Sequence, residues 1–120
     1  SSFVYKADER NKDRVINDKY DEALDEAKDT AHTVSQFKKA AKDPNQMTAM
    51  EYAEKLDEFM KSPTYKRYTV INDAKKKITK AFKELDNVDK ADRKAVEDFI
   101  LETKLKMFEE LENIEEQGNQ

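Results

Sequence analysis

The chain has 120 residues, of which 42% are charged and 37% hydrophobic, and its formal net charge is −4. The chain has only one glycine and two prolines, which argues against a sheet protein with many tight turns. It has no cysteine, which excludes disulfides and thiolate metal sites. The abundance of Ala, Lys, Glu, Asp and Leu is typical of long helices, and the length fits one domain over residues 1–120.

The first predicted helix ends near Ala41, before Pro44, which disfavours helical geometry at the preceding residue and has no N–H to donate. Its apolar residues recur every three or four positions, as one helix face requires: Ile16, Tyr20, Ala23, Leu24, Ala27, Ala31, Val34 and Ala41, with Phe37 beside them. The helix can start as early as Phe3, but residues 6–14 are almost wholly polar. We therefore expect residues 1–14 to form a polar extension.

A second, shorter helix is predicted over residues 46–61, and a third from Ser62 to about Asp86. Ser62 followed by Pro63 is a start signal, because Ser caps exposed N–H groups and Pro fits the first turn. The inward side chains expected on the second helix are Ala49, Ala53, Leu56 and Met60, flanked by Tyr52 and Phe59. Those expected on the third are Tyr68, Ile71, Ala74, Ile78, Ala81, Phe82 and Leu85.

The fourth helix is predicted from the N-cap Asp89 to about Glu116, with a staple at Val88 and a frayed tail at residues 117–120. One apolar stripe comprises Val96, Ile100, Thr103, Met107, Leu111 and Ile114. A second stripe comprises Leu101, Leu105 and Phe108, with Phe99 in addition. This face is wide, so either the helix is central in the fold or the second stripe meets another molecule.

Short connections between long helices predict an all-α fold, an up-down antiparallel bundle of three to four helices. Charge is unevenly spread along this bundle. Residues 61–83 carry eight basic groups and one acid, a net charge of +7, whereas residues 84–120 carry five basic and twelve acidic groups, a net charge of −7. Antiparallel packing would set these opposite charges side by side, and ion pairs would then help to choose neighbouring helices.

The alternative interpretation is that the third helix presents a basic ridge to a polyanion or to an acidic protein. Lys76, Lys80 and Lys83 share one outward face, and Lys66 and Arg67 add charge near the helix start. The acidic chain, with an isoelectric point near 5.2, argues against nucleic acid as the partner. The connections around Pro44 and Asn87 are further candidate contacts.

Side chains suited to chemistry are few. His32 is the only histidine, near Asp29 and Gln36, and we expect it to be solvated or half-buried. An acidic ridge with i, i+4, i+8 spacing comprises Asp21, Asp25 and Asp29 and is expected to be a solvated face. No paired nucleophile and base and no phosphate loop is present, so we predict no catalytic, metal or cofactor site and no enzyme.

The whole chain resembles the helical outer-surface lipoproteins of Borrelia-type spirochaetes. The resemblance is compositional: no Cys or Trp, almost no Gly, and stretches such as NDAKKKITKAFKELDNVDKADRK and FILETKLKMFEELENIEEQ. It implies a domain held at the bacterial outer membrane by a lipid anchor attached to a cysteine absent from this sequence. It also implies capture of a host plasma protein, for instance the complement regulator factor H, in complement evasion. No binding residue carries over, because no family motif aligns.

The sequence therefore predicts a non-catalytic binding protein exposed at a bacterial surface. The candidate partner-binding residues are Lys66, Arg67, Lys76, Lys80, Lys83, Asn87, Leu101, Leu105 and Phe108. The alternative is a cytoplasmic or phage structural or adaptor protein that self-associates through the fourth helix, for example as a homodimer.

Overall fold

The computed structural model describes residues 2–43, 45 and 47–118, and it describes side-chain surroundings from residue 10 onward. These residues form four helices and no strand, namely α1 (Ser2–Ala41), α2 (Ala49–Met60), α3 (Pro63–Leu85) and α4 (Lys90–Gly118). The prediction of an all-α helical bundle is confirmed. Pro44, which was expected to end the first helix, lies outside the described residues.

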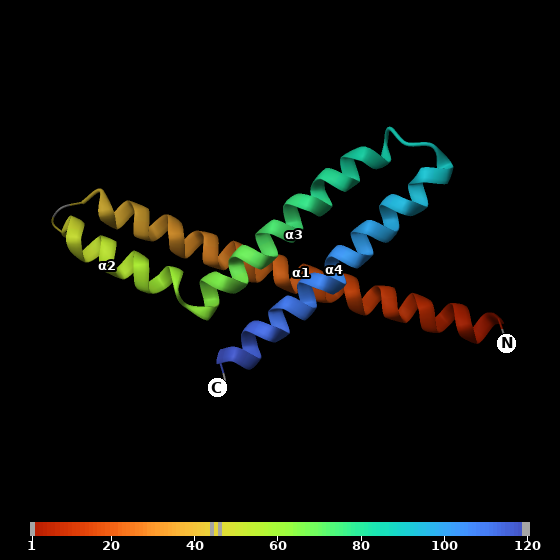
Figure 1. Cartoon of the computed structure of the whole chain (residues 1–120), viewed down its shortest axis with the longest axis horizontal. Coiled ribbons are helices and arrows are strands. Elements are labelled where there is room, and N and C mark those ends of the chain that lie inside the picture. Colours follow the sequence, from red (N-terminus) through yellow and green to blue (C-terminus); the bar gives the residue numbers. More distant parts are fainter. Residues whose placement is uncertain (1, 44, 46, 119–120) are drawn as a thin grey trace.

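The four helices form two antiparallel hairpins that cross each other (Figure 1). α1 pairs with α2, α3 pairs with α4, and α1 crosses the α3–α4 hairpin near the middle of the molecule. The extents are 66 × 38 × 17 Å, and the radius of gyration is 19.1 Å. A compact chain of this length would have a radius of about 14 Å, so the bundle is open.

The helix ends follow local capping chemistry. Ser62 caps α3 as predicted, since its Oγ accepts a hydrogen bond from the amide of Tyr65 at 3.3 Å. Thr48 caps α2 in the same way through Glu51, so this helix starts three residues later than the sequence suggested. Asp89 precedes α4, and its backbone carbonyl accepts the amides of Asp92 and Arg93, both at 3.0 Å.

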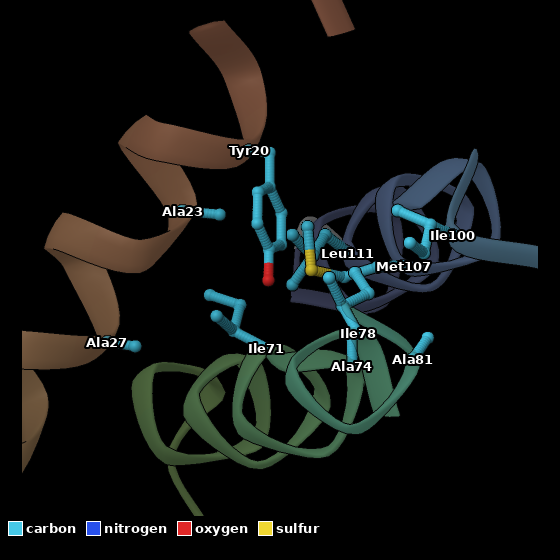
Figure 2. Close-up of a cluster of buried hydrophobic side chains, with 10 residues drawn as sticks. All are labelled: Tyr20, Ala23, Ala27, Ile71, Ala74, Ile78, Ala81, Ile100, Met107 and Leu111. Atoms are coloured by element: carbon cyan, nitrogen blue, oxygen red, sulfur yellow. The ribbon is translucent and has the colours of Figure 1, made fainter. Parts of the chain in front are cut away.

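One hydrophobic core holds α1, α3 and α4 together where the hairpins cross (Figure 2). Its buried residues are Tyr20, Ala23 and Ala27 of α1, Ile71, Ala74, Ile78 and Ala81 of α3, and Ile100, Met107 and Leu111 of α4. Most of the predicted inward positions lie in this core or at its edge. The helical period of the sequence therefore identified the correct buried faces in the central turns of α1, α3 and α4.

Some predicted inward positions are wrong. Ala31 is exposed, and Thr30 is buried in its place, with its hydroxyl bonded to the Glu26 carbonyl. Phe82 is 52% exposed, because α1 crosses the hairpin elsewhere and leaves this part of α3 uncovered. α2 buries no residue fully, although Phe59 contacts Phe37 and Tyr65 at ring-centroid distances of 5.4 and 5.7 Å.

Both chain ends of the described region are helical. Residues 10–14 are all exposed, and the N-terminal part of α1 extends past the crossing with no helix beside it (Figure 1). At the other end α4 continues through Gln117 and Gly118, two residues that the sequence assigned to a frayed tail. The exposure of residues 10–14 agrees with their polar composition.

Tyr20 gives the core a dependence on pH. Burial, and secondarily the charge of Asp21, raise the pKa of Tyr20 above its ordinary value of 10.0. Because the pKa of Tyr20 is raised, the folded state keeps the phenol proton at pH values at which the unfolded state has lost it. The free energy of unfolding therefore falls as the pH rises above the ordinary pKa of tyrosine. We expect the free energy of unfolding to fall less for Tyr20→Phe than for the natural chain between about pH 8 and about pH 11 in urea titrations. Equal losses in both chains would contradict burial of this ring.

Candidate functional site

The outer side of α3 carries a dense group of lysines, which we call the lysine face. It consists of Asn72, Lys75, Lys76, Thr79, Lys80 and Lys83, which line one shallow depression. All four lysines are exposed. The predicted ridge residues Lys76, Lys80 and Lys83 therefore do lie on one surface, together with a fourth lysine, Lys75.

No direct ion pair links the lysine face to α4 in the described part of the chain. α3 packs more extensively against α4 than against any other helix, as the opposite charges suggested. Among the described residues, however, no ion pair joins the two helices, since the three present are Lys61–Asp57, Arg67–Glu26 and Arg93–Glu97. The lysines of this face are therefore exposed to solvent and free of direct ion pairs among the described residues.

Arg67 has an internal partner on α1. Its Nε lies 3.0 Å from Oε2 of Glu26, and its Nη2 lies 3.0 Å from Oε1, which makes a bidentate, half-buried ion pair between α1 and α3. This arginine therefore adds one polar link between α1 and α3 to the hydrophobic core at the crossing. The neighbouring candidate Lys66 is exposed and separate from the lysine face.

The second stripe of α4 is only partly covered. Phe108 packs against the core, and the ammonium of Lys19 lies 5.8 Å from its ring centroid. Leu101 and Leu105 remain 37% and 45% exposed. α4 is therefore not central in the fold, and these two leucines are open to another molecule. Asn87, in the turn between α3 and α4, is also exposed.

An open groove of about 780 Å³ runs between α3 and α4, and we call it the α3–α4 groove. α3 supplies Val70, Asp73, Ala74, Lys77, Lys80, Ala81 and Glu84. α4 supplies Ala95, Val96, Phe99, Glu102, Thr103, Lys106, Met107 and Glu110. Lys80 belongs both to this groove and to the lysine face.

The remaining polar candidates lie on the surface. His32 is exposed, and its Nε2 lies 3.2 Å from Nε2 of Gln36. Asp21, Asp25 and Asp29 are exposed on α1. Within residues 2–43, 45 and 47–118 there is no group of three or more His, Cys, Asp or Glu side chains placed to hold a metal ion. No helix in the same residues is long and apolar enough to span a bilayer.

Sequence reasoning missed the α3–α4 groove and the Arg67–Glu26 pair. Both depend on the relative placement of helices, and the two paired residues are 41 positions apart in the chain. The only available signal for the groove was the wide apolar face of α4, in which Phe99 did not fit the main stripe.

Comparisons with family models, with curated proteins and with solved structures gave no match for this chain.

Proposed function

We propose that this chain is a non-catalytic protein-binding domain whose lysine face receives an acidic surface of a partner protein. The observation that carries the proposal is the set of exposed lysines on α3, which make no ion pair within the described residues although the acidic α4 lies beside them. A cluster of like charges costs electrostatic repulsion, and an acidic partner would remove that cost.

The chemistry of this surface favours a protein over a small molecule. The lysine face is shallow and is lined only by polar and charged residues, whereas small-molecule sites are concave and lined mainly by hydrophobic residues. Exposed apolar side chains of the same hairpin, Phe82 and Leu101, offer additional contact area within a charged surround. Proteins that meet through charged surfaces of this kind associate quickly, and their association weakens as the salt concentration rises.

The partner that we propose is a host plasma protein such as factor H, captured by a domain held at a bacterial surface through a lipid anchor. The support for this more specific proposal is the compositional resemblance to the spirochaetal surface lipoproteins. A pull-down from plasma at low and high salt tests it, with bacterial lysate in parallel. Capture of a plasma protein that weakens as salt is raised is the expected result, and capture only from lysate would reject it.

Reversing three charges on the lysine face should weaken capture strongly. We expect the combined change Lys76→Glu, Lys80→Glu and Lys83→Glu to lower affinity for the captured protein by at least about tenfold, because each lysine changes from attracting to repelling an acidic surface. Surface plasmon resonance measures the affinity, and circular dichroism confirms that helicity is kept.

A matched control makes the same change of net charge elsewhere. Lys12, Lys28 and Lys39 are exposed on α1, away from the lysine face, and their replacement by glutamate should leave affinity within about twofold. Equal losses in the two triple variants would show that net charge alone matters, and would remove the lysine face from the proposal.

A second candidate function is a cytoplasmic or phage structural protein that self-associates through the second stripe of α4. The observation in its favour is the exposure of Leu101 and Leu105. Under this candidate, sedimentation would show a dimer that is lost in Leu105→Ala.

A further inference from the structure

Among the described residues, no helix covers the side of the α3–α4 hairpin that carries the groove. Helices pack with their axes about 8–10 Å apart, so the shortest extent of 17 Å accommodates only two layers. α1 forms the second layer on the other side, where Lys104 contacts Tyr20 and Asn17. In agreement, the α3–α4 groove is lined by α3 and α4 alone, without a residue of α1 or α2.

The groove pairs a protruding ring with a floor of small side chains. Phe99 is 45% exposed although it borders the groove. The small residues that line the groove are Ala74, Ala81, Ala95 and Thr103. A phenylalanine ring from another molecule fits above such small residues, and burying it would remove much apolar area from water. The groove thus offers both a half-exposed aromatic ring and small side chains that such a ring can cover.

The charged rims of the groove are complementary to each other. Because α3 and α4 are antiparallel, Val70 and Glu110 mark one end of the groove, and Glu84 and Ala95 mark the other. Counted from these ends, Asp73 lies level with Lys106, and Lys77 lies level with Glu102. No ion pair closes between them across the groove in the described part of the chain.

We propose that a second copy of this chain covers the α3–α4 groove, with a two-fold axis that runs along it. Under this symmetry α3 of one copy lies over α4 of the other. Asp73 then faces Lys106 of the second copy, and Lys77 faces its Glu102. Each Phe99 enters the small-residue floor opposite. The two α3–α4 hairpins together form a four-helix arrangement with the apolar groove inside.

A partner of one charge sign suits this groove less well. Its rims carry three lysines and four acids, and both signs occur on each helix. A purely acidic or purely basic ligand would therefore meet repulsion at about half of the positions, whereas a second copy meets an opposite charge at the central ones. This dimer goes beyond the proposed capture function, and Lys76 and Lys83 stay outside its interface.

Sedimentation equilibrium of the full chain over a range of concentrations tests the dimer. Phe99→Ala should raise the dissociation constant by at least about tenfold, because two-fold symmetry removes the ring twice. Leu105→Ala is the matched control, since Leu105 is on the same helix and equally exposed at 45% but does not line the groove. Its dissociation constant should change by less than about twofold.

Charge exchange tests the arrangement itself. Asp73→Lys alone and Lys106→Asp alone should each weaken the dimer by about tenfold, and the double variant should restore it to within about threefold, because the pair is re-formed in reverse. A monomer at every concentration overturns the proposal. A dimer weakened by Leu105→Ala and not by Phe99→Ala overturns it in favour of the second stripe. A double variant without recovery overturns the proposed pairing of α3 with α4.

Discussion

Replacement of Ile71 by alanine is expected to lower the free energy of unfolding by about 3–4 kcal/mol. Ile71 is fully buried, with 0% of its surface exposed, and it lies where α1 meets α3 and α4 (Figure 2). The lost methyl and methylene groups give up their transfer free energy and leave a cavity. Because the hairpins share this one core, helices cannot easily close around the cavity without losing other contacts. Urea denaturation followed by circular dichroism measures the change.

Phe82→Ala is the control on the same helix. The sequence pattern placed both residues inward, and phenylalanine is the larger side chain, so pattern alone predicts at least an equal loss. The structure leaves Phe82 52% exposed, so we expect a loss below about 1 kcal/mol. A loss for Phe82→Ala that approaches that of Ile71→Ala would show that something covers the outer part of the hairpin in solution.

Features governed by neighbouring residues could be predicted from the sequence. Ser62 caps α3 because a hydroxyl three residues before an amide is placed to accept its hydrogen bond, whatever the rest of the chain does. The buried series Ile71, Ala74, Ile78 and Ala81 follows from the helical period in the same way. For these features, local geometry alone determines the result.

Features that depend on how far helices overlap could not be predicted. Every inward pattern assumes a neighbour along the whole helix, but α1 crosses the α3–α4 hairpin and leaves it soon afterwards. Phe82 and Leu101 therefore face solvent, although their spacing is that of core residues. α2 is an extreme case, because its predicted apolar face buries no residue fully.

The candidate site likewise has one part that follows from neighbouring residues and another part that depends on how helices are placed relative to each other. The lysine face lies on one helix, so its residues follow from helical spacing, and of its four lysines the sequence prediction left out only Lys75. Whether α4 neutralises it depends on side-chain distances between two helices, and no sequence pattern gives those. The α3–α4 groove requires both the register of an antiparallel pair and the absence of a third layer, so the sequence alone could not show it.

The crossing of α1 over the hairpin rests on small residues, and a charge placed there should undo it. Ala23 is 8% exposed and lies in the core beside Tyr20 and Ala27 (Figure 2). We expect Ala23→Asp to lower the free energy of unfolding by about 3 kcal/mol or more, because a carboxylate in an apolar contact loses its hydration. Urea denaturation gives the size of the loss. Hydrogen exchange should show faster opening of α1 at residues 16–30.

The same substitution two turns further along α1 separates burial from helix propensity. Ala31 was predicted to lie on the inward face but is exposed in the structure, so Ala31→Asp should cost only the propensity difference, about 0.5–0.7 kcal/mol. Both variants add one negative charge to the same helix. A large difference between them therefore measures the contact of α1 with α3 and α4. If the order were reversed, α1 would have to be rotated so that Ala31 replaced Ala23 in the core, and the Arg67–Glu26 pair could not form as it does here.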